Sequence, residues 1–219
     1  MRPQLYAHPF SSYCQKVLTA LYENATPFEY CTLGPDQPAH ESRLTELWPL
    51  RKFPVLADRG NTILESTTII EYLDVAHPGR TRFMPVDPRA AIEVRMMDRI
   101  FDNYVMGPMQ KIVLNQIRPE ANRDPYGVDE ARAMLDKTYE WLDRRLGAGT
   151  WAAGAEFTLA DCAAAPSLFY ADWAHEIAAN FENLRAYRQR LLQRPSFARA
   201  VDEARPFRPY FPLGAPDRD

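Results

Sequence analysis

Apolar and polar positions follow two different periods in the first 76 residues. Residues 4–7 predict a short strand that breaks at His8-Pro9. Apolar residues spaced i, i+3, i+4 and i+7 then predict a helix, with Cys14, Val17, Leu18 and Leu21 on one face. Pro27 ends this helix, and residues 28–32 alternate as a second strand. This βαβ order implies parallel pairing with a right-handed crossover.

The pattern then changes to a helix followed by a hairpin. Residues 43–47 predict a short helix, and two apolar runs follow at 53–57 and 62–64. Asp58-Arg59-Gly60-Asn61 separates the two runs, which is typical of a hairpin turn. Ser66 precedes a further helix over 67–76. The first part of the chain therefore reads βαβ, a helix, then ββα.

Helical periodicity dominates the rest of the chain. We expect a domain over residues 1–77, an ordered Pro- and Gly-rich linker over 78–88, and a helical domain over 89–219. Residues 90–118 predict one long helix, or two halves bent at Gly107-Pro108. Further helices are expected over 129–146, ended by Gly147-Ala148-Gly149, from about Leu159, over 184–193 and over 196–204. Residues 205–219 are expected to be extended. The predicted fold is a small α/β domain followed by an all-α domain.

Composition narrows the function classes. The 219 residues are 46% hydrophobic and 25% charged, with a net charge of −3, so no bulk positive field recruits nucleic acid or anionic lipid. Three widely spaced cysteines do not suggest a disulfide framework. Neither a signal peptide nor an apolar run near 20 residues is visible. We therefore expect a cytoplasmic protein that binds neither nucleic acid nor membrane.

Three short motifs carry candidate chemistry. Ser11 and Ser12 stand where a strand feeds a helix, where a serine either caps the helix or turns its O–H toward an anion. Phe53-Pro54 indicates a cis-proline turn that frees the Phe53 backbone for a ligand, or else an edge strand that starts with proline. Glu65-Ser66 at the next helix start offers a carboxylate to an ammonium and N–H groups to a carboxylate, or is merely a helix cap.

In combination, these motifs resemble the cytosolic glutathione transferases over residues 5–205. Residues 49–56 (Pro-Leu-Arg-Lys-Phe-Pro-Val-Leu) are similar to the family's Asn-Pro-x-Gly-Lys-Val-Pro-x-Leu segment. Glu65-Ser66 is similar to its glutamate–serine pair. Trp48 and Arg51 depart from the pattern, because the family has asparagine and glycine there.

The resemblance continues into the second half and implies both fold and activity. Asp87-Pro88 stands in the usual linker, and residues 158–161 (Thr-Leu-Ala-Asp) are similar to the family's buried capping box, in which Asp161 stabilises the fold. The resemblance implies a thioredoxin-like domain that binds glutathione as co-substrate and a helical domain that supplies the second-substrate wall. It implies a homodimeric detoxification enzyme with no metal and no tightly bound cofactor.

The resemblance also assigns the catalytic turn. Ser11-Ser12-Tyr13-Cys14 stands where redox relatives carry Cys-x-x-Cys, so a dithiol mechanism is lost, and the motif is similar to the serine-type, zeta-like classes. Ser11 is the first candidate to stabilise the glutathione thiolate, with Ser12 second. Tyr6 is an alternative hydroxyl, although strand alternation turns it into the sheet. Cys14 lies on the apolar helix stripe and is expected to be a buried structural thiol.

The remaining site residues follow from the same resemblance. The expected glutathione-binding residues are Lys52, Phe53, Pro54, Glu65, Ser66 and His40, with Lys52 and His40 as candidates for the glycine carboxylate. The expected second-substrate residues are Tyr104, Met106, Met109, Tyr170 and Trp173. One polar helix face is interpreted either as the dimer seam or as a merely solvated face: Arg95, Asp98, Arg99 and Asp102.

Three functions stay open at this point. The first is a transferase that activates glutathione for attack on a small electrophile, where isomerase and peroxidase activity would share the same thiolate. The second is a transferase-like protein that only binds partners, because fold alone never fixes function. The third is a glutathione-linked disulfide reductase, which Ser11 does not exclude because glutathione itself supplies the thiol.

Overall fold

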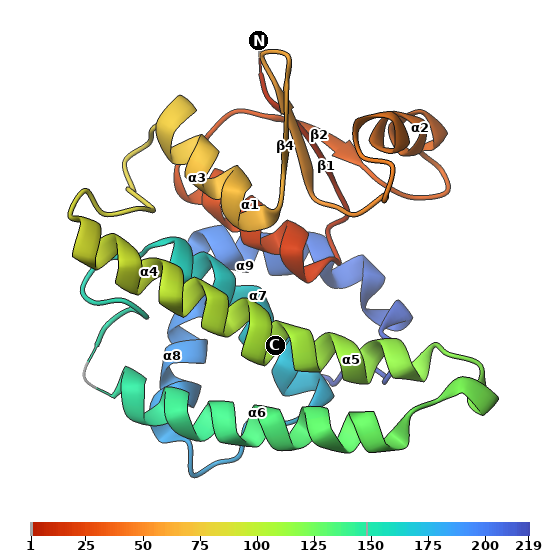
Figure 1. Cartoon of the computed structure of the whole chain (residues 1–219), viewed down its shortest axis with the longest axis vertical. Helices are drawn as coiled ribbons and strands as arrows, with labels where there is room; N and C mark the ends of the chain where they lie inside the picture. Colours follow the sequence, from red (N-terminus) through yellow and green to blue (C-terminus); the bar gives the residue numbers. More distant parts are fainter. Residues whose placement is uncertain (1, 148) are drawn as a thin grey trace.

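The computed structural model describes residues 2–147 and 149–219, and it confirms an α/β unit followed by a helical unit (Figure 1). The first unit has the predicted order of elements. It comprises β1 (Gln4–Ala7), α1 (Ser12–Glu23), β2 (Glu29–Thr32), α2 (Pro38–Leu47), β3 (Val55–Asp58), β4 (Asn61–Leu64) and α3 (Ser66–Ala76). The sheet order is β2-β1-β3-β4, with β1 parallel to β2 and the other neighbours antiparallel.

Alternation along β1 separates the two faces of this sheet. Leu5 and Ala7 lie in the main core together with the apolar stripe of α1. Tyr6 lies in a smaller cluster on the opposite face, where Leu44 of α2 covers it. The sheet is therefore covered by helices on both faces, as expected for a strand pair joined by a crossover helix.

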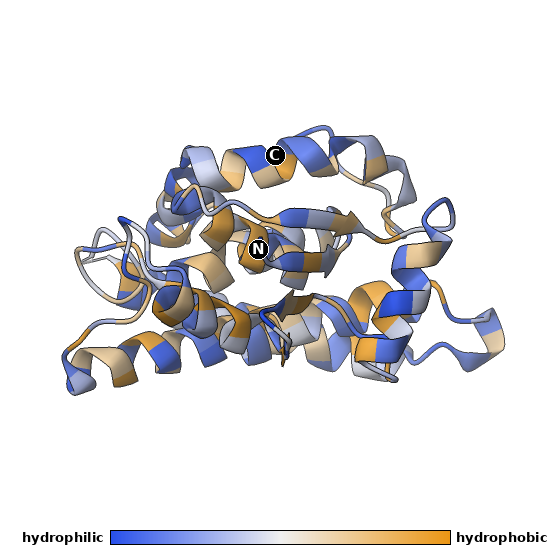
Figure 2. Cartoon of the chain, turned by 90° about the horizontal axis from the view of Figure 1, so that it is seen from above, coloured by the Kyte–Doolittle hydropathy of each residue, from blue (hydrophilic) through white to orange (hydrophobic). Residues whose placement is uncertain are grey.

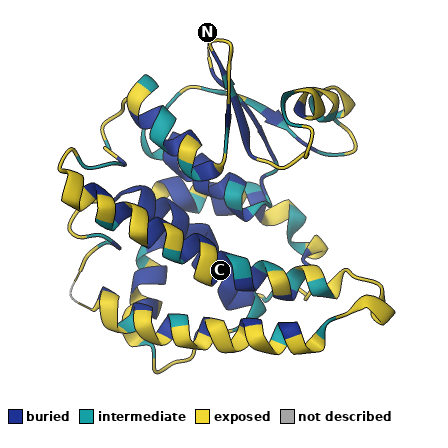
Figure 3. Cartoon of the chain, in the orientation of Figure 1, coloured by how far each residue is buried: buried dark blue, intermediate teal, exposed yellow. Residues whose placement is uncertain are grey.

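The second unit packs around one central helix. It comprises α4 (Pro88–Ile100), α5 (Gly107–Gln116), α6 (Pro125–Leu146), α7 (Leu159–Ala174), α8 (Glu182–Leu192) and α9 (Pro195–Ala204). Residues 159–173 of α7 are all buried, whereas α6 exposes one whole side (Figure 3). Hydrophilic and hydrophobic residues alternate along the surface helices (Figure 2). Among the described helices, none combines the length and apolar composition needed to cross a membrane.

Two predicted elements differ from the structure. The helical pattern of 90–118 changes before Gly107-Pro108; α4 and α5 are joined by a π-helical turn, η1 (Phe101–Met106). Pro108 has no N–H to donate to the carbonyl of Tyr104, and the wider turn precedes this lost hydrogen bond. The tail is not fully extended, because Arg205–Tyr210 forms a 3₁₀ helix, η3. The helix end predicted around Ala148 falls on a residue outside the described ranges.

The segment between the two units is packed rather than flexible. Phe83 is 1% exposed and belongs to the core that runs through both units. Its N–H donates to Asp74 at 3.0 Å, and its carbonyl accepts from the Leu159 N–H at 3.1 Å. The two units therefore share one continuous core.

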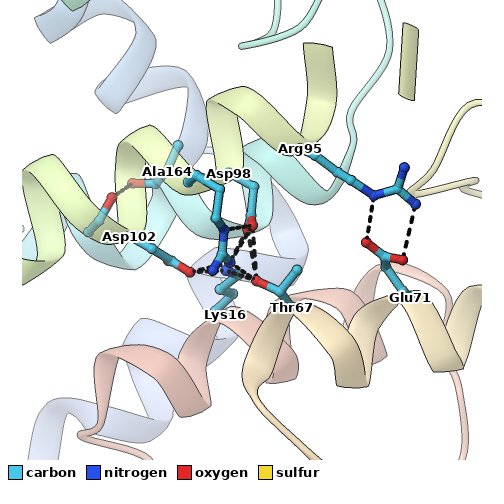
Figure 4. A network of polar contacts seen from close by, with 9 residues as sticks. Lys16, Thr67, Glu71, Arg95, Asp98, Asp102 and Ala164 are labelled. Atoms are coloured by element: carbon cyan, nitrogen blue, oxygen red, sulfur yellow. Dashed lines mark hydrogen bonds and ion pairs between the residues drawn. The ribbon is translucent and has the colours of Figure 1, made fainter. Parts of the chain in front are cut away.

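A buried charge cluster joins the units directly (Figure 4). The Lys16 ammonium of α1 is fully buried and donates to Asp98 at 2.6 Å and Asp102 at 2.8 Å. Thr67 at the start of α3 also accepts from Lys16 at 2.9 Å, and the Arg99 guanidinium pairs with both aspartates. The polar face of α4 is therefore turned toward the first unit within one chain. That this face is a dimer seam stays a prediction, although its charges are paired within the chain.

The capping box at α7 is confirmed. Asp161 is fully buried and accepts from the N–H of Thr158 and of Ala152, each at 2.8 Å. Tyr187 adds a 2.6 Å hydrogen bond to the same carboxylate. Asp161 therefore holds the start of α7, the preceding loop and α8 together.

A second polar link lies at the far end of α1. The half-buried Glu23 carboxylate accepts from Arg194 at 2.9 Å and from Ser196 at 2.7 Å, at the start of α9. Burial raises the pKa of Glu23, but the donors Arg194, Ser196 and Thr81 outweigh it and hold the pKa below its ordinary value.

We expect Glu23→Gln to lower the free energy of unfolding by about 1–3 kcal/mol at pH 7. Since the folded-state pKa is depressed, this contribution is present above the unfolded pKa of about 4.3 and is lost as pH falls through the folded pKa. The measurement is urea unfolding of both proteins from pH 7 to pH 3. Glu46→Gln is the control, because its ion pair with Arg43 is exposed and should change stability by less than about 0.5 kcal/mol. A Glu23 effect that does not shrink in acid would contradict the assignment.

Candidate active site

A cavity of about 750 Å³ opens where the two units meet. This volume lies within the range of about 300–1,000 Å³ that is usual for small-molecule sites. The first unit contributes mainly polar and charged lining residues, among them Ser11, Ser12, Tyr13, Arg51, Lys52, Glu65 and Ser66. The second unit contributes mainly apolar ones, among them Met109, Val113, Leu114, Tyr170 and Phe211. The cavity therefore joins a polar half and an apolar half.

Ser11 sits at the start of α1 and lines the polar half. It is the N-cap residue, with extended backbone, and its Oγ accepts from the Cys14 N–H at 3.4 Å. That hydrogen bond is long, and it leaves the hydroxyl proton available to an anion at the helix N-terminus. The position of Ser11 is thus compatible with both predicted roles, a helix cap and a hydrogen-bond donor to a bound anion.

The other three residues of this turn differ in whether they reach the cavity. Ser12 is the first residue of α1 and also lines the cavity. Tyr13 lines it too, and burial together with the nearby Asp102 raises its pKa to about 12, so its phenol is protonated at neutral pH. Cys14 is fully buried and its pKa is raised to about 12 by burial, which confirms a structural thiol. Tyr13 is a hydroxyl donor that the sequence analysis missed, although it lies within the same motif.

The Phe53–Pro54 peptide bond is cis, as expected. Strand β3 begins at Val55, so the backbone of Phe53 stays outside the ladder and borders the cavity. Lys52 lines the same wall. Arg51 adopts a left-handed φ of 52° and donates to Glu41 at 2.9 Å. This position is the one that departs from the family's glycine.

Glu65 and Ser66 form the opposite wall of the polar half. Glu65 is the N-cap of α3 with a φ of 66°, and its side chain makes no capping hydrogen bond. Ser66 is the first helical residue, not the N-cap that the sequence suggested, because the left-handed turn comes one residue earlier. The exposed carboxylate of Glu65 and the first N–H groups of α3 are therefore free to face a zwitterionic ligand.

The predicted second-substrate residues are divided among three environments. Met109 and Tyr170 line the cavity. Met106 is fully buried, and Trp173 packs behind Tyr170 at a ring-centroid distance of 5.6 Å. Tyr104 is 49% exposed and lines a separate groove between η1 and α6. For Tyr104, Met106 and Trp173 the predicted place on the cavity wall is wrong. Tyr104 and Met106 lie within the π turn and do not line the cavity, and Trp173 packs against Tyr170 instead.

Two other candidates lie away from the cavity. His40 is half-buried, with its Nδ1 2.8 Å from the Thr32 carbonyl and its ring edge-on to Tyr6. It does not line the cavity, so the prediction that it binds the glycine carboxylate is not supported by its position. Tyr6 is 4% exposed within the sheet cluster, as strand alternation predicted.

The tail supplies residues that the sequence analysis did not assign. Tyr210, Phe211 and Pro212 line the apolar half, and Arg99, Asp102, Asn103 and Gln110 border it from η1 and its neighbours. The signal available in the sequence was the aromatic and proline content of residues 207–212. No local pattern indicates that this segment folds back over the first unit.

Comparison with known proteins agrees with this geometry. Residues 5–81 match a family model described as glutathione S-transferase, N-terminal domain, and residues 125–190 match the C-terminal domain of the same family. A crystal structure of a glutathione S-transferase from Methylobacterium radiotolerans, in complex with glutathione sulfonate, is 30% identical. It superposes with a TM-score of 0.79 over 92% of this chain and 95% of that one. The chain belongs to the glutathione S-transferase family.

Relatives within this transferase family carry different activities in their names. A stringent starvation protein A homolog from Coxiella burnetii is 28% identical over 91% of this chain and 91% of that protein. A protein described as a probable maleylacetoacetate isomerase from Caenorhabditis elegans is 25% identical over 94% of this chain and 95% of its own length. Family membership therefore leaves the specific reaction open.

The left-handed backbone of Glu65 generates a stability prediction. We expect Glu65→Gly to raise the free energy of unfolding by about 0.5–1 kcal/mol, because glycine adopts a positive φ without steric cost. The measurement is urea denaturation. Lys52→Gly is the control, since Lys52 has no positive φ, and glycine there should lower stability by a similar amount. A Glu65→Gly protein less stable than wild type would contradict a strained backbone at this wall.

Proposed function

We propose that this protein is a glutathione-dependent transferase in which glutathione binds with its sulfur at the N-terminus of α1. The observation that carries the proposal is that one cavity joins Ser11 with Phe53-Pro54 and with Glu65-Ser66. The Glu65 carboxylate would bind the γ-glutamyl ammonium, and the N–H groups at Ser66 its carboxylate. The Phe53 backbone would hold the cysteinyl residue, and Lys52 the glycine carboxylate. No metal and no tightly bound cofactor takes part in this scheme.

In this proposal the enzyme acts by ionising the thiol. A free thiol with a pKa of about 8.5 is only slightly ionised at pH 7. A hydrogen bond from Ser11 to the thiolate contributes about 1.5–3 kcal/mol, and the helix N-terminus about 0.3–1 kcal/mol. Together they lower the thiol pKa by about 1.5–3, at about 1.4 kcal/mol for each. The thiolate is then the main form, and an electrophile held in the apolar half completes the reaction by proximity.

The alternatives to conjugation are other reactions of the same glutathione thiolate and a role without catalysis. Double-bond isomerisation is favoured by the similarity to proteins described as probable maleylacetoacetate isomerases. Peroxide or disulfide reduction needs only a glutathione thiolate and an accessible apolar half. A partner-binding role without turnover is a further alternative, because fold alone does not fix function. Against this last role, a scaffold has no use for an open cavity lined by Ser11, Glu65 and Ser66.

Ser11→Ala tests the thiolate assignment. We expect kcat/KM for conjugation to fall about tenfold or more at pH 7 and the apparent thiol pKa to rise by about 1–2. Because glutathione itself supplies the thiol, the rate of the variant should approach that of wild type at a pH above the new pKa. The measurement is the pH profile of kcat/KM with an aromatic halide.

The controls separate catalysis from helix capping. Loss of the cap costs about 1 kcal/mol of stability, so thermal unfolding is followed for each variant. Ser11→Thr retains the hydroxyl and should retain the profile, and Ser12→Ala tests the neighbouring serine. Unchanged kcat/KM at pH 7 for both alanine variants would refute a serine-type mechanism. Calorimetry that detects no glutathione binding would favour the partner-binding alternative.

We also propose that the protein is a homodimer and that the apolar face of η1 and α6 forms the contact. A groove of about 540 Å³ lies there, and three large side chains around it are partly exposed: Tyr104 at 49%, Met134 at 43% and Trp141 at 39%. Exposed apolar side chains gathered around one groove are typical of an association surface. This apolar face is an alternative to the polar face of Arg95, Asp98, Arg99 and Asp102, whose charges are paired within the chain.

Trp141→Arg should convert the dimer to monomer at micromolar concentration, because a buried unpaired cation at a contact is strongly unfavourable. Sedimentation velocity measures the change. Tyr126→Arg is the matched control, since Tyr126 lies on the same helix, is 73% exposed and does not line the groove. A monomeric wild type, or a Trp141→Arg protein that stays dimeric, would contradict this interface.

A further inference from the structure

The turn that carries Ser11 is held by hydrogen bonds from residues on either side of it. Ser11 donates its backbone N–H to the His8 carbonyl at 3.0 Å. The fully buried Gln15 side chain donates to the Pro9 carbonyl, also at 3.0 Å. His8 makes a second contact through its ring, because its Nδ1 lies 3.1 Å from the Phe10 N–H. The residue that follows β1 therefore holds the turn through both its backbone and its side chain.

The contact between the His8 ring and the Phe10 N–H requires a neutral imidazole. A backbone N–H can only donate, so Nδ1 must be the acceptor and the ring carries its single proton on Nε2. In the imidazolium both ring nitrogens are donors, so two N–H groups would face each other and the hydrogen bond is lost. Protonation of His8 therefore removes one of the hydrogen bonds that hold the turn.

The surroundings of His8 favour this neutral ring. Burial lowers the pKa of His8 below its ordinary value of 6.5, although the field of Glu41 on α2 acts in the opposite direction. The Glu41 carboxylate is itself paired with Arg51 at 2.9 Å. Phe207 of η3 packs edge-on against the imidazole with a centroid distance of 4.6 Å. The ring is therefore neutral at pH 7 and becomes charged in mild acid.

The other charged groups on the elements around this ring are paired among themselves. Residues 4–13 contain no Asp, Glu, Lys or Arg. The pairs on α1, α2 and η3 are Lys16 with Asp98 and Asp102, Glu23 with Arg194, Arg43 with Glu46, and Arg205 and Arg208 with Asp219. His40 of α2 contacts the Thr32 carbonyl. Tyr13 and Cys14 stay neutral, because burial raises the pKa of each to about 12.

We propose that His8 is a positioning residue whose neutral ring holds the Ser11 hydroxyl in place for the glutathione thiolate, so that protonation of His8 switches the turn to a less active geometry. The inference rests on the proposed glutathione function. His8 does not line the cavity, so it acts through the turn and not on the ligand. A displacement of the hydroxyl by about 1 Å is enough to weaken its hydrogen bond to the sulfur severely.

The charge of an imidazolium acts in the opposite direction. A cation near the sulfur favours the thiolate and would lower the thiol pKa. Because His8 lies outside the cavity and faces the Glu41 carboxylate, we expect the loss of the turn geometry to outweigh this attraction. The sign of the effect of His8 protonation on the rate therefore separates positioning from simple electrostatics.

His8→Asn tests the pH dependence, because the asparagine Oδ1 can accept from the Phe10 N–H at any pH. At pH 7.5 its kcat/KM should lie within about twofold of wild type. Relative to these values, the wild type at pH 4.5 should fall about threefold or more below His8→Asn, since it must keep both the thiol and the imidazole deprotonated. The measurement is the pH profile of kcat/KM for an aromatic halide at saturating glutathione, with tryptophan fluorescence to verify the fold at each pH.

His8→Leu removes the acceptor at every pH and does not depend on the acid measurements. At pH 7.5 it should lower kcat/KM about three- to tenfold and raise the apparent thiol pKa, and His8→Asn should restore both. Affinity for S-methylglutathione, which has no thiol, should stay within about twofold, because Phe53 and Glu65 are unchanged.

His175→Asn is the matched control. His175 is also half-buried, with its Nε2 2.7 Å from Asp136, and it does not line the cavity. This variant removes a titrating imidazole without touching the turn, so the rate at pH 7.5 and the acid limb of the profile should both match those of wild type.

The outcomes distinguish this inference from the proposed function. The positioning role is overturned by acid limbs of equal steepness in wild type and His8→Asn, by a wild type that falls less steeply, or by a His8→Leu protein that keeps its rate at pH 7.5. A His8→Leu protein that loses affinity for S-methylglutathione as strongly as it loses rate would overturn it as well. Each of these results leaves the transferase standing. Failure of wild type to bind glutathione in calorimetry would overturn the proposed function and the inference with it.

Discussion

The fold depends on one buried ammonium. Lys16 has no exposed surface, and removing such a charge from water costs several kcal/mol unless partners surround it. Its partners are Asp98 and Asp102, on a helix of the other unit that begins after the linker. Because all three charges are paired across the junction, this contact helps to specify how the two units meet.

That docking also sets the shape of the cavity. Ser12 and Lys16 are one helical turn apart on α1, so they share a face. Asp102, which receives the Lys16 ammonium, lines the cavity together with Ser12. The distance from the start of α1 to the second-unit wall is therefore fixed by the buried charges beneath it. The same contact therefore fixes the position of the polar half of the cavity relative to the apolar half.

The polar half carries backbone that stability alone would not favour. Arg51 and Glu65 both adopt left-handed φ values, 52° and 66°, and both line the cavity. In each case the turn directs neighbouring polar groups toward the same space. Backbone strain at these two positions is compatible with the binding role proposed for this wall.

Prediction from the sequence succeeded for structural features that depend on local interactions. The apolar stripe of α1, the turn at Gly60 and the carboxylate of Asp161 each depend on neighbours within a few residues, and all were predicted. The family resemblance placed Met109 and Tyr170 correctly on the apolar half, whereas Tyr104 and Met106 do not line it. Both of these residues lie within the π turn, whose wider hydrogen-bond pattern has no signature in the sequence.

By itself, then, the sequence determined the elements, their order and the polar motifs at helix starts, since these follow from periodicity, capping and turn chemistry along the chain. Only the tertiary structure decided that Lys16 meets Asp98, a residue 82 positions away, and that Phe211 closes the apolar half beside Phe10. Such contacts depend on packing summed over the whole core, and no short stretch of sequence carries that information.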